Sequence, residues 1–336
     1  MPLSALEFAC RMPKAELHLH IEGTLEPDLA FRLARRNGIT LPYADEKALH
    51  AAKNFTDLQS FLDLYYACAD VLRSEEDFAD LMSAYLERAH ADHVVHAEIF
   101  FDPQTHTARG IPFGTVVRGL TEGMRRGRDL GVSSRLILCF LRHLGEADAW
   151  ATLAEAEPYL DQIDGFGLDS SERGHPPAKF ARVFARVRAF GKPVVAHAGE
   201  EGPPAYIVEA LDVLNARRID HGVRAVEDPA VLARLVRERV PLTVCPLSNV
   251  RLCVFPNMTA HSLPRLLDAG ALVTINSDDP AYFGGYMNDN IRAVQDAFKW
   301  DRATWAQIAR NSFAASWAGA GDRARWERDL EAVVAM

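Results

Sequence analysis

Ala15-Glu16-Leu17-His18-Leu19-His20, an apolar run that ends in two histidines two residues apart, is the stretch that decides the fold. In a β-strand, side chains alternate between the two faces, so residues two apart point the same way. We therefore expect both imidazoles to project from one strand end toward a single point, as two ligands of one metal ion would. Because 12 histidines in 336 residues give about 0.4 such pairs by chance, the interpretation depends on the rest of the chain.

Three further polar motifs also follow short apolar runs. They are His197-Ala198-Gly199-Glu200, Asp220-His221-Gly222 and Ser277-Asp278-Asp279-Pro280. Each motif ends a segment that reads as a strand, and each carries residue types that bind metals or transfer protons. The chain therefore repeats one arrangement, a strand followed by polar chemistry, at four separate positions.

Eight β-branched or apolar runs predict eight strands. They are Ala15–His20, Val94–Phe101, Ser134–Leu141, Gly165–Leu168, Pro193–Ala196, Arg218–Ile219, Pro241–Val244 and Ala271–Asn276. Most intervals between them carry apolar residues at three- and four-residue steps, which is typical of amphipathic helices. This alternation predicts the α/β class and a (β/α)8 TIM barrel with a parallel sheet. The alternative, a doubly wound open sheet, lacks a G-x-G-x-x-G motif after the first strand.

The interval between His20 and Val94 is too long for one helix. We expect extra helices there, lying over the strand ends and able to form a lid. No repeat, low-complexity tract or Ser/Gly linker divides the chain, so we expect a single domain over residues 1–336. The tail after Asn311 predicts a final packing helix. The polar motifs fall at the C-terminal ends of the first, fifth, sixth and eighth predicted strands, where the loops of such a barrel form the active site.

The composition and net charge of the chain limit the kinds of partner that it is expected to bind. The formal net charge of −9 argues against a nucleic-acid backbone or an anionic membrane as partner, and a small neutral or cationic ligand fits better. Five scattered cysteines without a C-x-x-C pair indicate reduced thiols. The chain has neither a signal-peptide pattern nor an apolar run of the ~18 residues that a membrane span needs. We expect a cytoplasmic protein, and a homo-oligomer is compatible with the sequence.

Three histidines and one carboxylate are the candidate metal ligands, namely His18, His20, His197 and Asp278. This set suits zinc or another first-row divalent ion and leaves room for water. The alternative is that each imidazole is merely hydrogen-bonded in or near the core. The remaining histidines have no comparable placement, and we assign them no chemistry: His50, His90, His93, His96, His106, His143, His175 and His261.

Glu200 and His221 are the candidate proton-transfer residues. A carboxyl group beside a metal and partly desolvated can hold a proton near neutral pH, as a general acid must, so Glu200 fits this role. The alternative for Glu200 is an N-cap of the helix expected at 203–214. His221 is expected to orient or deprotonate a water molecule, or else to be a fourth ligand or a structural residue. Of the adjacent carboxylates Asp278 and Asp279, one is placed to bind metal and the other to face the substrate.

Signatures of other enzyme classes are missing from the sequence. It contains no H-E-x-x-H helix, no G-x-S-x-G elbow and no phosphate loop of the G-x-x-x-x-G-K type. The zinc deaminases that act on nucleic acid need H-x-E with P-C-x-x-C, whereas Cys245-Pro246 has the reverse order and lacks the second cysteine.

Over nearly all of its length the chain resembles the adenosine/adenine deaminase branch of the amidohydrolase superfamily. The segments that carry the resemblance are Pro13-Lys14-Ala15-Glu16-Leu17-His18-Leu19-His20-Ile21-Glu22-Gly23, His197-Ala198-Gly199-Glu200, Arg218-Ile219-Asp220-His221-Gly222, Cys245-Pro246-Leu247-Ser248-Asn249 and Asn276-Ser277-Asp278-Asp279-Pro280. The family fold is the same (β/α)8 barrel with one zinc ion per chain, in agreement with the strand pattern.

The resemblance implies a role for each motif. The metal would be bound by His18, His20, His197 and Asp278. Glu200 would donate a proton to ring N1, His221 would assist the attacking hydroxide, and Asp279 would accept a hydrogen bond from the N7 side of a purine. The implied reaction is hydrolytic, with attack at C6 and loss of ammonia. Binuclear relatives need a bridging Lys or Glu near the fourth strand end, and the segment 167–172 contains no Lys, which favours one metal.

Departures from the adenosine deaminase pattern suggest the substrate. Glu22 stands where adenosine deaminases typically carry an Asp that meets the ribose, and Ser170-Ser171 stands where they usually show Gly-Asp. Both changes, like the segment 100–106, resemble the adenine deaminase subgroup. We therefore expect free adenine to be converted to hypoxanthine and ammonia, a purine-salvage step, with Glu22 and Ser170 contacting the base. Deamination of adenosine or of N6-substituted adenines, a binuclear amidohydrolase and a non-catalytic metal-binding barrel remain alternatives.

Overall fold

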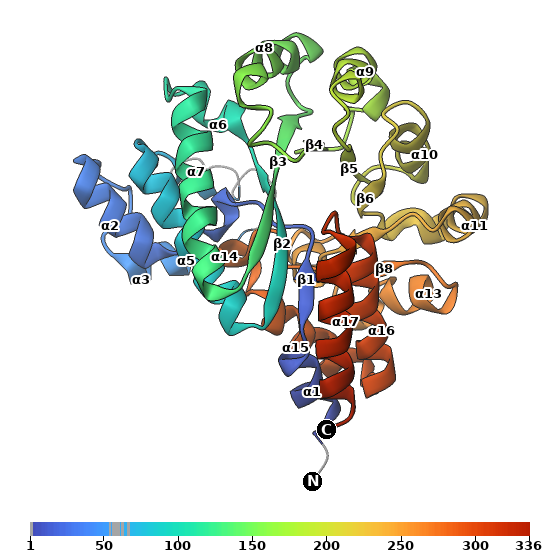
Figure 1. Cartoon of the computed structure of the whole chain (residues 1–336). Helices are drawn as coiled ribbons and strands as arrows, with labels where there is room; N and C mark the ends of the chain where they lie inside the picture. The colour runs from blue at the N-terminus through green and yellow to red at the C-terminus, as the bar shows by residue number, and fades with distance from the viewer. Residues whose placement is uncertain (1–2, 54, 56–60, 62–63, 66–67) are drawn as a thin grey trace.

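The strands of the computed structural model are all parallel and curl around a common axis (Figure 1). The structure describes residues 3–53, 55, 61, 64–65 and 68–336. The strands are β1 (Lys14–Glu16), β2 (Val94–Phe101), β3 (Ser133–Leu141), β4 (Gly165–Asp169), β5 (Val195–Ala198), β6 (Arg218–His221), β7 (Leu242–Val244) and β8 (Val273–Ile275). They form two four-stranded sheets in sequence order, β1-β2-β3-β4 and β5-β6-β7-β8.

Two seams join these sheets into a barrel. An isolated parallel bridge pairs Phe166 of β4 with Val194 beside β5, and another pairs Leu19 with Asp278. At the second seam, His20 N donates a hydrogen bond to Asp278 O at 3.0 Å. The chain segments that carry the first and last polar motifs are thereby brought side by side, and the predicted (β/α)8 barrel is confirmed.

The first strand is shorter than the sequence predicts. The predicted strand was Ala15–His20, but β1 ends at Glu16. Beyond it, the N–H of Leu17 donates to the side-chain Oδ1 of Asn276 at 2.7 Å instead of to a neighbouring strand. The chain then pairs again only through isolated bridges. The predicted end was wrong because a side-chain acceptor beyond β8 replaces the backbone ladder.

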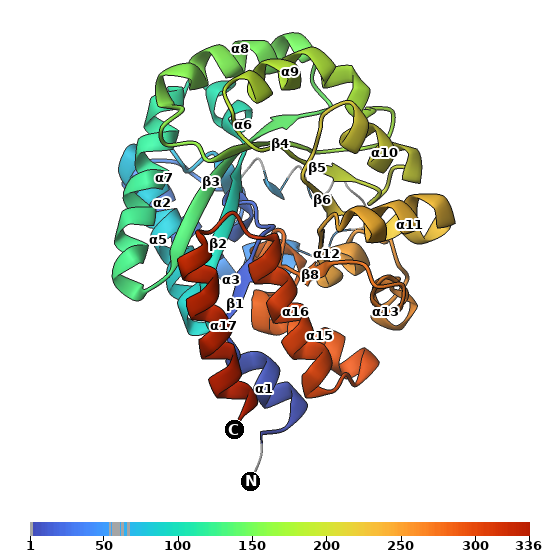
Figure 2. The same ribbon diagram turned by 45° about the vertical axis from the view of Figure 1, so that its right-hand side comes forward.

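Helices cover the outside of the barrel. They are α1 (Ala5–Arg11), α2 (Pro27–Asn37), α3 (Glu46–Ala52), α5 (Glu75–Ala91), α6 (Pro103–Thr107), α7 (Phe113–Gly127), α8 (Glu146–Ala156), α9 (Ala181–Ala189), α10 (Pro204–Asp212), α11 (Pro229–Glu238), α12 (Pro246–Arg251), α13 (Leu263–Asp268), α14 (Pro280–Phe283), α15 (Met287–Phe298), α16 (Arg302–Ala315) and α17 (Ala320–Val334). Short 3-10 helices are η1 (Glu22–Thr24), η2 (Arg128–Leu130), η3 (Glu157–Tyr159), η4 (Pro177–Phe180), η5 (Val223–Glu227) and η6 (Met258–Ala260). Figure 2 shows α8 and α9 arching over one side, while α1 packs with α15, α16 and α17 near both termini.

The predicted extra helices after the first strand are present as α2 and α3, and α5 precedes β2. α5 begins where Ser74 and Asp77 form a capping box, each side chain accepting the other's backbone N–H. Between these helices, Phe61 and Tyr65 are buried and line a cavity above the barrel. Within the interval where extra helices are expected, residues 54, 56–60, 62–63 and 66–67 lie outside the described residues. The lid therefore stays a prediction.

The predicted C-terminal helix is confirmed as α17, whose Trp326 and Leu330 are buried against the barrel. Inside the barrel, a small apolar cluster forms beneath the polar motifs from Phe100, Ile137, Cys139 and Val195, with Trp317 packed against it. In the described part of the chain, no helix combines the length and apolar character that crossing a membrane requires.

Candidate metal centre and active site

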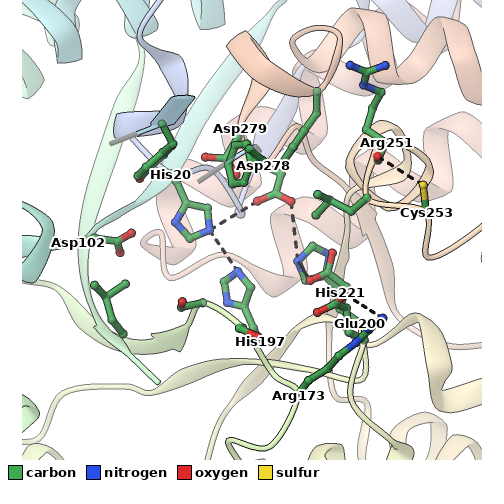
Figure 3. Close-up of a pocket in the computed structure, with 18 of the residues that line it drawn as sticks. His20, Asp102, Arg173, His197, Glu200, His221, Arg251, Cys253, Asp278 and Asp279 are labelled. Atoms are coloured by element: carbon green, nitrogen blue, oxygen red, sulfur yellow. Dashed lines mark hydrogen bonds and ion pairs between the residues drawn. The ribbon is translucent and has the colours of Figure 1, made fainter. Parts of the chain in front are cut away.

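Three imidazoles and one carboxylate converge at the C-terminal end of the barrel, in agreement with the sequence-based expectation (Figure 3). His20 Nε2 lies 3.2 Å from His197 Nε2 and 3.5 Å from Asp278 Oδ1. His18 Nε2 lies 3.2 Å from the same Asp278 oxygen. One candidate ligand atom from each of these residues falls within 4.8 Å of all the others. The first, fifth and eighth strand ends thus meet at one point, as the barrel requires.

These distances fit a divalent metal ion. Ligand atoms at 2.0–2.1 Å from a tetrahedral zinc stand about 3.4 Å from one another, close to the observed 3.2 to 3.5 Å. His18 Nε2 is buried and has no hydrogen-bond partner among the described residues. His20 Nε2 and His197 Nε2 face each other at the separation expected of two ligands, an arrangement typical of ring lone pairs directed at one cation. The residues of the cluster therefore fit the metal that the donor set implies.

Outer contacts surround two of these imidazoles, and of the two only His18 has a hydrogen-bond partner at Nδ1 among the described residues. His18 Nδ1 lies 3.1 Å from Thr243 Oγ1, and Thr243 Oγ1 donates to Asp220 Oδ1 at 2.8 Å. The other oxygen of Asp220 lies 3.7 Å from His197 Nδ1. An acceptor at Nδ1 keeps the proton on that nitrogen and leaves the Nε2 lone pair for a metal. Asp220, which precedes His221 in its motif, is not among the site residues predicted from the sequence.

The charges of the cluster suit metal binding as well. Burial lowers the pKa of His197 well below its ordinary value, and the neighbouring His18 adds to the effect. Although burial opposes ionisation of Asp278, the surrounding imidazoles, His18 foremost, hold its pKa below the ordinary value. A neutral imidazole and an ionised carboxylate are the forms that coordinate a metal.

The backbone is constrained at the same positions. His221 and Asp278 adopt left-handed conformations, with φ of +63° and +68°. Such conformations are uncommon for non-glycine residues and cluster at functional sites. Gly199 also has φ of +71°, and a Cβ there would lie 2.6 Å from Ile207 Cδ1. Only glycine fits where the chain turns between His197 and Glu200.

Glu200 and His221 face each other at the edge of the cluster. Glu200 Oε2 lies 3.5 Å from His221 Nε2, and the same nitrogen lies 3.8 Å from Asp278 Oδ2. Asn249 Nδ2 donates to Glu200 Oε1 at 3.1 Å and lies 3.2 Å from His221 Nδ1. His261 Nε2 in turn lies 3.2 Å from Asn249 Oδ1. The resemblance had drawn attention to the segment of Asn249, but no role had been assigned to it or to His261.

Both side chains have pKa values displaced in the direction that their expected roles require. Burial raises the pKa of Glu200 well above its ordinary value, and the charge of Asp278 adds to the rise. Burial lowers the pKa of His221 well below its ordinary value, as does the nearby His18. The alternative that Glu200 caps a helix is wrong, because Pro203 occupies the N-cap position of α10.

Asp279 lines the cavity beside the cluster. Burial raises its pKa well above the ordinary value, and the adjacent Asp278 adds to the rise. The loop after β1 approaches this residue so closely that a Cβ on Gly23 would lie 2.0 Å from Asp279 Oδ1. Gly23, the last residue of the H-x-H-x-E-G motif, therefore leaves the space that the Asp279 side chain occupies.

Glu22 is buried behind the wall of the cavity. Its Oε1 accepts hydrogen bonds from Asp102 N at 3.1 Å and from His106 Nε2 at 2.8 Å. The hydrogen bond from His106 holds the pKa of Glu22 below its ordinary value although burial opposes this. The other oxygen, Oε2, has no hydrogen-bond partner among the described residues. His106, to which we assigned no chemistry, is thus the partner that orients Glu22.

Asp102, which sequence reasoning missed, lines the cavity in front of Glu22. It forms a second group of candidate ligand atoms with Asp169 and His20, within 4.8 Å of one another, and His20 Nδ1 lies 3.5 Å from Asp169 Oδ2. Burial raises the pKa of Asp102 well above its ordinary value, and Asp169 adds to the rise. The only sequence signal for Asp102 was its place in the segment 100–106.

The cavity above the cluster has a volume of about 570 Å³. Ser170, with φ of +71°, lines its edge, and its Oγ lies 2.7 Å from His143 Nδ1. Arg173, Arg251 and Cys253 also line the cavity, on the side away from Asp102 (Figure 3). The cavity is in the size range of small-molecule sites, and the metal cluster forms part of its wall.

Comparisons with known proteins agree with this geometry. The family model described as adenosine deaminase matches residues 13–332. A protein of Geotalea uraniireducens named adenine deaminase is 61% identical over 324 residues, covering 96% of this chain and 91% of the relative. One of Cupriavidus necator with the same name is 60% identical over 322 residues, covering 96% and 92%.

Two solved structures are also similar. The crystal structure of adenine deaminase from Arthrobacter aurescens has a TM-score of 0.95 and 50% identity, covering 97% of this chain and 100% of that one. An amidohydrolase from Burkholderia ambifaria with bound Zn has a TM-score of 0.89 and 26% identity, covering 100% and 95%. The family model and these near full-length relatives show that the chain belongs to the adenosine deaminase family.

Proposed function

We propose that the chain is a zinc-dependent adenine deaminase, folded as one domain over residues 1–336, that hydrolyses adenine to hypoxanthine and ammonia. The observation that carries the proposal is the cluster of three imidazoles and Asp278 opening into a cavity whose wall also holds Glu200 and His221. The relatives named adenine deaminase, at about 60% identity over nearly the whole chain, support adenine as the substrate.

One zinc ion per chain would be held by His18, His20, His197 and Asp278. When bound, such an ion lowers the pKa of water and so supplies a hydroxide-strength nucleophile near neutral pH. A second ion between His20, Asp102 and Asp169 is not part of the proposal, because a His20 that binds the first ion through Nε2 keeps its proton on Nδ1, the nitrogen that faces Asp169.

Two side chains of this chain carry the proton transfers. His221 has its Nδ1 beside Asn249, so its Nε2 faces the cluster and would hold the attacking oxygen there. Glu200, whose raised pKa keeps its proton, protonates N1 and so draws electron density from C6. Water adds its oxygen to C6; one of its protons reaches the amino nitrogen, which leaves as ammonia, and the other replaces the proton that Glu200 gave to N1.

Asp279 would bind the five-membered ring at N7. In the N9–H form of adenine, N7 offers a lone pair and no hydrogen, so the carboxyl group has to donate in this contact. This direction is opposite to the sequence-based expectation, in which Asp279 accepts. The raised pKa of Asp279 agrees with a donating carboxyl group.

Selection of the free base would come from the side of the cavity that carries Asp102, with Glu22 behind it and Ser170 at the edge. Only the free base has an N9–H, and these carboxyl groups offer acceptors to it. A ribose on N9 would leave a buried acceptor unpaired, at a cost of about 1–3 kcal/mol before any clash. We therefore expect adenine to be preferred.

The test is ammonia release from adenine, adenosine and N6-methyladenine, compared as kcat/KM. Adenine should exceed adenosine by at least ~100-fold, and Glu22→Asp should narrow that ratio by opening space. Equal rates with adenosine would refute the choice of the free base and leave a deaminase. A higher rate with N6-methyladenine would favour the alternative of N6-substituted substrates.

A further inference from the structure

Glu172, on the loop after β4, has its carboxylate enclosed by backbone N–H groups of the next loop. Its Oε1 accepts from Gly199 N at 2.9 Å. Its Oε2 accepts from Glu200 N and Glu201 N at 2.8 Å each and from Gly202 N at 2.7 Å. The side chain of Glu172 is 1% exposed. One buried carboxylate therefore satisfies four consecutive amides.

These amides need an external acceptor. Residues 199–202 form bends between β5 and α10, so no helix or strand ladder receives their N–H groups. Buried N–H groups without partners are rare in folded proteins, and successive amides that point at one anion form a concave nest. The loop that carries Glu200 thus takes its shape around the carboxylate of Glu172.

A second buried side chain, next to Glu172, holds the strand that leads into this loop. Arg142, which follows β3 and is fully buried, donates from Nη1 to His197 O at 2.6 Å and from Nε to His175 O at 2.8 Å. The same Nη1 lies 3.7 Å from Glu172 Oε1. Arg142 therefore fixes the end of β5 at His197, and Glu172 fixes the loop that begins two residues later.

We propose that Glu172 is a positioning residue for Glu200. By holding the amides of 199–202, it sets the backbone from which the Glu200 side chain reaches into the cavity, 3.5 Å from His221 Nε2. Both oxygens of Glu172 are occupied by these amides, so it is not placed as a metal ligand. The inference rests on the proposed function, in which Glu200 is the proton donor.

Glu172→Gln is the most direct test, because it keeps the shape and replaces one acceptor oxygen with an NH2 group that faces other donors. A displacement of a reacting group by about 1 Å can cost ~100-fold in rate, so kcat should fall at least ~10-fold. KM and bound metal should stay near the wild-type values. Glu172→Asp keeps the charge but retracts it by one methylene. Its kcat should lie between those of the wild type and of Glu172→Gln.

The same substitution in a Glu200→Gln background separates positioning from general damage. If Glu172 acts through Glu200, Glu172→Gln has little further effect once Glu200 is changed. An equal fall in kcat in both backgrounds would overturn the proposal. So would a loss of metal in proportion to the loss of activity.

Glu146→Gln is a matched control. Glu146 also accepts backbone N–H groups, from Arg182 at 2.9 Å and Val183 at 3.1 Å at the start of α9, but it does not line the cavity. This variant should retain wild-type kcat. An equal fall in kcat in the control would mean that loss of any such cap impairs the enzyme, and would count against a special role of Glu172.

Amide hydrogen exchange provides a readout that does not depend on the proposed function. Glu172→Gln should speed exchange at Gly199 to Gly202 while leaving the amides of β4 protected, whatever the substrate. Unchanged exchange in that loop would overturn the inference. If wild-type protein fails to release ammonia from adenine while the exchange result holds, the proposed function fails and the structural role of Glu172 stands.

Discussion

The loops after β4 and β5 each carry a glutamate whose side chain is largely withdrawn from solvent, and the two glutamates have opposite surroundings. Glu172 is enclosed by four backbone N–H donors. Among the described residues, Glu200 accepts one hydrogen bond, from Asn249, and its pKa is raised by burial and by the charges of Asp278 and Glu172. Donors stabilise a carboxylate, whereas burial among like charges favours the protonated acid. Glutamate can therefore serve either to hold a loop, as Glu172 does, or as the proposed proton donor, as Glu200 does, according to the groups around it.

Of the substitutions at these two glutamates and their neighbours, Glu200→Gln should lower kcat the most. Gln keeps the shape and the hydrogen-bonding capacity but cannot deliver a proton to N1. We expect kcat to fall by ~10² to 10⁴-fold, the range of general acid catalysis, with bound metal unchanged. Steady-state kinetics together with metal analysis of the same sample provide the check. A variant that loses its metal, yet is fully active when metal is resupplied, would make Glu200 a ligand and not the acid.

Removing the hydrogen bond from Asn249 to Glu200 should lower kcat less than Glu200→Gln does. Asn249→Ala deletes a contact to Glu200 Oε1 and another to His221 Nδ1, so both side chains lose an orienting partner. A fall in kcat of roughly 10-fold is expected from the imperfect geometry. Ser248→Ala, at a buried hydroxyl next to it in α12, is the neighbouring control and should change kcat much less. Equal effects of the two substitutions would contradict the role of Asn249.

The pH dependence of kcat should sharpen the comparison further. The acid form of Glu200 is the active one, so activity is lost as pH rises through its raised pKa. The lowered pKa of His221 keeps the imidazole neutral well into acid. We expect kcat to fall on the alkaline side as Glu200 ionises, and on the acid side only where His221 becomes protonated. Because Asn249 lowers the pKa of Glu200, Asn249→Ala should move the alkaline limb to higher pH, and a move to lower pH would contradict the assignment.

The sequence predicts the barrel well where long apolar runs form strands. The predicted bounds of β2, Val94–Phe101, coincide with those observed, and β3 begins one residue earlier than predicted. β5 was placed two residues too early, at Pro193–Ala196, since Pro193 has no N–H to give to a ladder. These errors arise where pairing depends on a neighbouring strand or side chain that local sequence does not reveal.

The candidate site also contains some residues that could be predicted from the sequence and others that could not. The convergence of His18, His20, His197 and Asp278 could be predicted because their strand ends share one rim of the barrel. The contacts of Glu172 could not, because its donors are backbone amides 27 to 30 residues away, whose identity carries no signal. The candidate metal ligands could be predicted from the sequence, whereas the groups that hold the site in shape could not.

Ammonia release from adenine before and after metal removal tests the central claim most directly. Purified chain should contain about one zinc-like ion per protomer. Chelation should abolish turnover, and addition of zinc should restore it, while His197→Ala should neither retain the ion nor recover. Full activity in metal-free protein, or no ammonia from adenine in zinc-loaded protein, would contradict the account.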